Sequence, residues 1–154
     1  MEIEFLRTNG DDPDFRGLVK LLDGYLAETD GEDHSFYDQF NKVDSIKYVV
    51  LAFDQGKAVA CGAIKEFDPQ SMEVKRMFVH PSFRGQGISK LVLGELERWA
   101  TQLGFSRCVL ETGKRQVEAI GLYLKSGYQV TPNYGQYIDM DNSVCFEKIL
   151  ESQQ

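Results

Sequence analysis

The sequence predicts a single α/β domain, classed as α+β in some schemes, in which a mixed β-sheet is flanked by helices. Three observations predict this fold class. β-rich runs alternate with stretches of helical period along the chain. The 154 residues, 42% hydrophobic and 27% charged, suit one domain with a substantial core. No repeat, low-complexity segment or linker divides residues 1–154, so we expect one domain to span them.

The N-terminal part of the chain predicts one strand and two helices. Ile3 and Phe5 alternate with acidic residues, as in a strand with one buried face. The apolar stripe of a first helix then comprises Phe15, Leu18, Val19, Leu22, Tyr25 and Leu26. After a polar break at 29–33, a second, short helix would bury Phe36, Tyr37 and Phe40.

The middle of the chain predicts three consecutive strands. Residues 48–53 and 58–67 are β-rich, and Asp54-Gln55-Gly56-Lys57 between them is a hairpin signature. Residues 72–79 form the next strand. Pro81 ends it, because proline lacks a ladder donor and restricts His80 to extended geometry.

The C-terminal half predicts two helices and three strands. The apolar stripe of a central helix, which ends at Gly104, comprises Ile88, Val92, Leu96, Trp99 and Leu103. The remaining elements, in order, are a strand at 108–111, a helix at 117–125 capped by Gly127, a strand at 128–131 and a last strand at 144–150.

A glycine-bearing loop, Arg84-Gly85-Gln86-Gly87-Ile88-Ser89, joins the strand 72–79 to the central helix. The first turn of a helix has unpaired N–H groups, and glycines let the backbone approach an anion. Residues 75–94 contain four basic side chains and no Asp or Glu, although the formal net charge of the chain is -7. This cationic island in an acidic protein indicates one site for a polyanionic ligand.

The loop lacks the patterns of two common phosphate-binding motifs. A Walker loop needs Gly-x-x-x-x-Gly-Lys-Ser/Thr, and a dinucleotide fingerprint needs a third glycine where Lys90 stands. The pattern present is Arg-x-x-Gly-x-Ser, with Val79-His80-Pro81 before it and Leu91 and Leu93 after it. It resembles the acetyl-CoA loop of the GNAT superfamily of N-acetyltransferases.

A second motif strengthens the resemblance. Ala119, the pair Leu122-Tyr123, Gly127 and Tyr128 are similar to the second GNAT motif, about thirty residues downstream. The resemblance covers roughly Val49 to Leu150. Two residues depart from the family pattern: Ser89 stands where Gly or Ala is usual, and Gln116 stands where many members carry a pantetheine-binding asparagine, which leaves that contact open.

The resemblance implies a GNAT-like sheet of about six to seven strands. It implies acetyl-CoA as co-substrate, no metal, and acetyl transfer to a primary amine by direct attack in a ternary complex. In the family, strand backbone binds the pantetheine and loop amides bind the pyrophosphate. The cofactor-binding residues so implied are Met77, Phe78, Val79, Arg84, Gly85, Gln86, Gly87, Ile88, Ser89, Gln116 and Tyr123.

Acetyl transfer needs a group that protonates the leaving thiolate. The resemblance implies that Tyr123, in the Leu-Tyr pair, is this catalytic acid. The alternative is a core tyrosine, because Ile120 and Leu124 lie nearby on the predicted helix.

The reaction also needs a route for the ammonium proton. Glu73 is the candidate catalytic base, since strand alternation places it on the same face as Lys75 and Met77, at a position from which some GNAT enzymes present a glutamate. The alternative for Glu73 is a solvated strand end. Glu111, at the end of the next strand, is a second candidate and could instead bind the substrate cation. We reject His80, part of the strand-ending Val-His-Pro, and His34, in a polar loop.

Charge offers the one indication of the acceptor. Residues 1–44 carry twelve acidic side chains against four basic ones, which favours a cationic small-molecule or protein amine, although an acidic surface can also serve solubility alone. Tyr134 and Tyr137 either bind this acceptor or belong to a plain connecting loop.

The composition disfavours other classes of partner. The net charge and the short basic island argue against nucleic acid, and no apolar run reaches membrane-spanning length. Cys61, Cys108 and Cys145 lie in strand-like segments without metal spacing, so we expect reduced, buried thiols in a cytoplasmic monomer or homodimer without a secretory signal. The alternatives to an active enzyme are a catalytically silent acetyl-CoA-binding sensor or assembly domain and, more weakly, a nucleotide-binding regulator.

Overall fold

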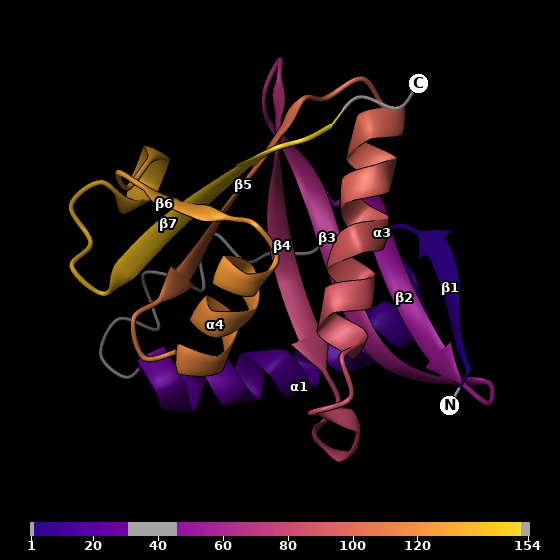
Figure 1. The fold of residues 1–154 in the computed structure, drawn as a ribbon. Helices are drawn as coiled ribbons and strands as arrows, with labels where there is room; N and C mark the ends of the chain where they lie inside the picture. Colours follow the sequence, from indigo (N-terminus) through magenta and orange to yellow (C-terminus); the bar gives the residue numbers. More distant parts are fainter. Residues whose placement is uncertain (1, 31–45, 152–154) are drawn as a thin grey trace.

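A computed structural model describes residues 2–30 and 46–151. The described residues form one mixed sheet with helices on both faces, which confirms the predicted fold class (Figure 1). The sheet order is β1-β2-β3-β4-β5-β7-β6. Its strands are β1 (Ile3–Thr8), β2 (Tyr48–Asp54), β3 (Lys57–Asp68), β4 (Ser71–Val79), β5 (Arg107–Gly113), β6 (Gln129–Thr131) and β7 (Ser143–Ile149).

Three α-helices lie within the described residues, namely α1 (Pro13–Asp30), α3 (Ile88–Gln102) and α4 (Val117–Lys125). Two 3-10 turns, η2 (Pro81–Phe83) and η3 (Gly135–Tyr137), connect strands to the elements that follow them. The predicted short helix with Phe36, Tyr37 and Phe40 lies outside the described residues, as does His34.

The helices divide the core between the two faces of the sheet. Alternating residues of β2 show this: Val50 and Ala52 pack in the cluster that contains α3, whereas Val49 and Leu51 pack in the cluster that contains α1. Period-two alternation sends successive side chains to opposite faces, so both faces of the central strands are apolar and covered. The predicted stripe of α1 is buried at Phe15, Leu18, Val19 and Leu22.

Four predicted positions differ from the structure for local reasons. Phe5 is exposed because β1 is an edge strand, and Tyr25 is exposed where its ring lies beside the Arg84 guanidinium. Leu103 is exposed because α3 ends at Gln102. Tyr128 is not part of β6: Gly127 adopts a φ of 93°, and the Tyr128 N–H donates to the Tyr123 carbonyl, so this residue closes α4.

The sheet opens between its two parallel strands. β4 and β5 pair from Ser71 with Arg107 to Glu73 with Val109, and their pairing stops there although both strands continue. Figure 1 shows the carboxyl ends of β4 and β5 diverging, with α4 beside the opening. Ligands of α/β sheets bind at such carboxyl ends.

A β-bulge at Arg76 reorients the end of β4. Ala63 pairs with Lys75 and Cys61 with Phe78, so β4 has one more residue than β3 between these two pairs. Arg76 lies in this interval and has a φ of 58°. The prediction that Glu73, Lys75 and Met77 share a face is therefore wrong for Met77.

Neighbouring side chains confirm this change of face. Met72 and Val74 pack in the cluster that contains α3, so Glu73 between them points to the opposite face. Met77 packs in the same cluster as Met72 and Val74, because the extra residue in β4 inverts the alternation.

Candidate functional site

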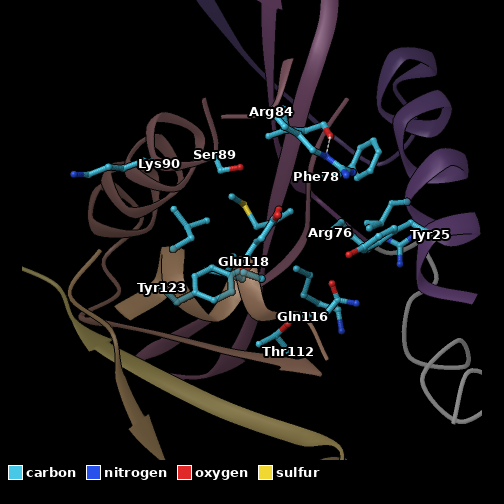
Figure 2. Close-up of a pocket in the computed structure, with 18 of the residues that line it drawn as sticks. Tyr25, Arg76, Phe78, Arg84, Ser89, Lys90, Thr112, Gln116, Glu118 and Tyr123 are labelled. Carbon is cyan, nitrogen blue, oxygen red and sulfur yellow. Dashed lines mark hydrogen bonds between the residues drawn. The ribbon is translucent and has the colours of Figure 1, made fainter. Parts of the chain in front are cut away.

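A cavity of about 620 Å³ occupies the opening between β4 and β5 (Figure 2). Its walls come from α1, β4, the loop that follows β4, the start of α3, the end of β5 and α4. It brings together most of the predicted site residues, namely Glu73, Met77, Phe78, Val79, Arg84, Gly85, Gly87, Ile88, Ser89, Glu111, Gln116, Tyr123 and Tyr137. Gln86 and Tyr134 do not line it.

The loop before α3 presents main chain to this cavity. Gly85 and Gly87 have φ values of +80° and +79°, a conformation that favours glycine, and a Cβ at either position would meet nothing within 4 Å. Gly87 is the N-cap of α3 and provides no side-chain cap, and the first turn contains no acidic residue. The N–H groups of this turn are therefore available to an anion in the cavity.

The guanidinium of Arg84 is turned toward α1. Its Nε donates to the Val79 carbonyl at 3.1 Å, and its Cζ lies 5.4 Å from the ring centroid of Tyr25 and 5.5 Å from that of Phe78 (Figure 2). These contacts hold the start of the loop against β4 and α1. The loop therefore offers main-chain N–H groups, rather than this guanidinium, at the start of α3.

Tyr123 lies at the cavity from its place on α4. Its side chain is buried, and its ring packs edge-on against Tyr128, with 5.9 Å between centroids. Burial, with the nearby charge of Glu111, raises the pKa of the Tyr123 phenol above 10. The phenol therefore carries its proton at neutral pH, as a general acid must.

Two carboxylates, one from each strand beside the opening, also line the cavity. Glu73 Oε2 accepts a hydrogen bond of 2.6 Å from the Tyr134 hydroxyl, and Glu73 Oε1 lies 3.6 Å from Lys75 Nζ. Glu111 Oε2 accepts one of 2.6 Å from Ser143 Oγ. Tyr134 thus reaches the site through Glu73, although it does not line the cavity.

Tyr137 places a second phenol beside these carboxylates. Burial and the charges of Glu111 and Glu73 raise the pKa of this phenol, so it stays a hydrogen-bond donor at neutral pH. Its ring packs against that of Tyr134 at 5.8 Å between centroids. The segment after β6 therefore supplies one wall of the site.

Gln116 supplies a buried polar group to the cavity. It is the N-cap residue of α4 and lines the cavity. Its Nε2 is buried, and no hydrogen-bond acceptor for it exists among the described residues. Buried amide groups are normally hydrogen-bonded, so this donor is available to a ligand.

Sequence reasoning missed part of the lining. Leu22, Tyr25 and Leu26 of α1 were assigned to the core, and Arg76 and Thr112 were not assigned to the site, yet all five line the cavity. The signal for Arg76 was its place in the cationic island. His80, rejected as a base, accepts a hydrogen bond of 3.2 Å from the Ser82 N–H at its Nδ1 and so caps η2.

Two further features concern the described residues. They contain no group of three or more His, Cys, Asp or Glu side chains placed to hold a metal ion. None of the described helices is both long enough and apolar enough for a membrane crossing.

A mixed sheet that opens between parallel strands, beside a glycine-bearing helix start, is an arrangement with which α/β proteins bind anionic ligands. The model of the acetyltransferase (GNAT) family matches residues 13–128. The IAA acetyltransferase of Azospirillum brasilense is 36% identical over 136 residues, which make up 86% of this chain and 88% of that protein. The chain therefore belongs to the acetyltransferase (GNAT) family, which confirms the family resemblance and the enzyme class.

Solved structures agree with this assignment. The structure of a proposed acyl-CoA N-acyltransferase from Klebsiella pneumoniae matches with a TM-score of 0.82 at 28% identity, over 97% of this chain and 98% of that one. A GNAT family acetyltransferase from Elizabethkingia anophelis, solved with acetyl-CoA bound, matches with a TM-score of 0.71 at 20% identity, over 96% and 98% of the two chains. The second likeness concerns the fold alone.

Proposed function

We propose that this chain, as one domain over residues 1–154, is an acetyl-CoA-dependent N-acetyltransferase that acts on a primary amine by direct attack in a ternary complex. The observation that carries the proposal is that the glycine loop, the separated ends of β4 and β5, and Tyr123 all open into one cavity. A long ligand with a phosphate at one end and a thioester at the other fits such an arrangement.

The cofactor is held by main chain and by one amide. The N–H groups at the start of α3 receive the pyrophosphate, where glycines leave room for it. The backbone of Met77, Phe78 and Val79 is unpaired with β5 and accepts the pantetheine as an added strand. The Nε2 of Gln116, which has no hydrogen-bond partner among the described residues, donates to a pantetheine carbonyl. It does so although the glutamine side chain is one methylene longer than the asparagine of many family members.

The transfer then proceeds by direct attack within the ternary complex, without an acetyl-enzyme intermediate. The ammonium of the acceptor loses a proton to Glu73, directly or through water, and the amine attacks the thioester carbonyl. The carbon–sulfur bond breaks as the tetrahedral intermediate collapses, and Tyr123 donates its proton to the departing thiolate. The extra proton still carried by the acetylated nitrogen returns through water to the Tyr123 phenolate, and Glu73 releases the first proton to bulk water. Glu111, Tyr134 and Tyr137 border the acceptor on the side of the carboxylates.

The state of the thiols supports a proposal for the compartment. Cys61, Cys108 and Cys145 are free and fully buried, and disulfides are not formed among them. This supports a reducing compartment such as the cytoplasm.

Thermal unfolding tests the cofactor assignment. Acetyl-CoA at a hundredfold excess over its Kd should stabilise the protein by about 2.7 kcal/mol, whereas adenosine should not. Gly87→Asp should abolish the gain, because a carboxylate would occupy the phosphate position. Gly87→Asn is the matched control, since asparagine has the same size, tolerates a positive φ and carries no charge.

Release of free CoA thiol with a panel of amines tests turnover. Thiol release that depends on the amine supports the enzyme. Cofactor binding without thiol release from any amine would instead support the catalytically silent sensor, and an unchanged melting temperature at millimolar acetyl-CoA would contradict both.

A further inference from the structure

Arg76 is a buried cation with unused hydrogen-bond donors. Its side chain is 1% exposed and lines the cavity on the α1 side (Figure 2). Nη2 forms an ion pair with Asp23 of α1. Nε and Nη1 are buried and have no hydrogen-bond partner among the described residues.

Such a group needs an acceptor. A guanidinium stays protonated in proteins, so burial cannot neutralise it as it can a lysine or a carboxylic acid. Buried charges are normally paired and their donors satisfied, because desolvation without a partner is costly. The Asp23 side chain is 43% exposed and engages one nitrogen, which leaves the N–H groups of Nε and Nη1 to another anion.

The backbone at Arg76 supports a role in the site. Arg76 has a φ of 58°, which is uncommon for a residue with a side chain. Because of the β-bulge, the side chains of Lys75 and Arg76 both lie on the face of the sheet that carries Glu73. In a regular strand, successive side chains would point to opposite faces, and one of the two would point toward α3. Strained backbone of this kind concentrates at binding and catalytic sites.

The phosphate end of the cavity has an anion site of its own, without Arg76. The loop amides of Gly87 to Ser89 already offer an anion site, and the Arg84 guanidinium lies over Tyr25 and Phe78. Glu73 lies three residues from Arg76 on β4, a strand length of about 10 Å. The cation therefore lines the same cavity as Glu73 and Glu111, on the strand that carries Glu73.

We propose that Arg76 binds a carboxylate of the acceptor, so that the substrate is a compact amine that also carries a carboxylate, as a free amino acid does. The inference rests on the proposed function. The acceptor ammonium lies toward Glu73 and Glu111, and its carboxylate lies on Nε and Nη1 of Arg76. This refines the cationic acceptor expected from the acidic N-terminal region: the amine end is cationic, and the whole molecule is zwitterionic.

Matched pairs of acceptors test the proposal. Free amino acids and their carboxamides, with identical side chains, differ in the group that Arg76 would bind. We expect kcat/KM, measured by release of CoA thiol, to favour the acid of the preferred pair by about 10- to 100-fold, as for a charge-assisted hydrogen bond. Arg76→Gln should bring this ratio near one through loss on the acid, and Arg76→Lys should retain part of it.

The KM for acetyl-CoA shows whether the anion that Arg76 binds belongs to the acceptor or to the cofactor. If Arg76 serves the acceptor, the KM for acetyl-CoA stays unchanged in Arg76→Gln. Lys90→Gln is the matched control, because it removes a cation from the loop side of the same cavity and should leave the ratio of acid to carboxamide as it is. A raised KM for acetyl-CoA with an unchanged ratio would assign Arg76 to a cofactor phosphate and overturn the proposal.

The remaining outcomes are also decisive. The proposal is wrong if the wild type does not prefer the acid, if no acid in the panel releases thiol although acetyl-CoA stabilises the protein, if Arg76→Gln keeps the preference, or if Arg76→Lys keeps all of it. Where Arg76→Gln unfolds, Arg76→Lys carries the comparison. Failure of the wild type to bind acetyl-CoA would overturn the proposed function itself. This result can be told apart from failure of the proposal for Arg76, in which acetyl-CoA still binds.

Discussion

Tyr123 combines a packing role with a chemical one. Its ring contacts Tyr128 and Phe146, which satisfies the interpretation as a core tyrosine, and it also lines the cavity with a protonated phenol. Tyr123→Phe keeps the ring and removes the proton. If Tyr123 is the acid, the maximal rate should fall about a hundredfold or more, while affinity for acetyl-CoA hardly changes.

The pH profile separates the two roles. Because burial and the charge of Glu111 raise the pKa of Tyr123 above 10, its contribution to the rate persists through neutral pH and is lost only above pH 10. The phenylalanine variant should lack that high-pH limb. An undiminished rate, measured with a substrate whose chemical step is rate-limiting, would leave Tyr123 a packing residue and reduce catalysis to proximity and backbone polarisation.

Glu73 gives the second residue-scale prediction. Glu73→Gln keeps the size of the side chain and an acceptor for the Tyr134 hydroxyl, but it cannot take up a proton. We expect a smaller, pH-dependent loss of rate than for Tyr123→Phe, because water can relay the ammonium proton to bulk. Tyr134→Phe is the control, because it removes only the hydrogen bond to Glu73. If the rate falls as much in Tyr134→Phe as in Glu73→Gln, Glu73 is a positioning residue and not the base.

At the scale of elements, the order of strands and helices followed from hydrophobic periodicity, but the bulge in β4 did not. The segment around Arg76 reads as an uninterrupted strand, since an extra residue in a pairing is a relation between two strands. Its consequence was the wrong face for Met77. Sequence alone likewise did not indicate that Leu22, Tyr25 and Leu26 line the cavity, because a cavity wall and a core surface have the same apolar pattern.

The packing of α3 on β3 depends on Gly62. A Cβ there would lie 2.5 Å from Met77 Sδ, 2.8 Å from Leu96 Cδ1 and 3.0 Å from Val92 Cγ1. Gly62→Ala should therefore destabilise the protein by about 1–3 kcal/mol through overpacking, seen as a lower midpoint in urea. Gly94→Ala on α3 is the control: its Cβ would lie 3.6 Å from Arg98 Nη1, and alanine favours a helix, so equal destabilisation by both changes would contradict this account.

For the whole molecule, the two GNAT motifs located the cofactor loop and α4, because both lie in short, contiguous segments. The acceptor side could not be predicted in the same way. It combines α1, the bulge of β4 and the segment after β6, which are distant in sequence and meet only in the fold. The acidic balance of residues 1–44 predicted a cationic acceptor. The buried charge in the cavity wall is that of Arg76, which lies outside this range.

The three thiols predict how the stability of the whole fold depends on pH. Burial raises the pKa of Cys61 and of Cys108 to about 12, and that of Cys145 to about 11, from an ordinary value of 9.0. These groups keep their protons longer in the folded state than in the unfolded one. Their contribution to stability is complete below pH 9 and is lost as the pH rises toward 12.

Urea unfolding across the alkaline range measures this loss. The free energy of unfolding should fall between pH 9 and pH 12, and Cys61→Ala should show a shallower fall because one of the shifted thiols is gone. At pH 8 a thiol reagent should label the native protein slowly and all three cysteines once urea is added, since the thiols are buried and protonated. Rapid labelling of native protein would mean that the sheet opens around these cysteines. The Cys61 Sγ donates to the backbone carbonyl of Arg76, so such an opening would also let water reach the Arg76 guanidinium.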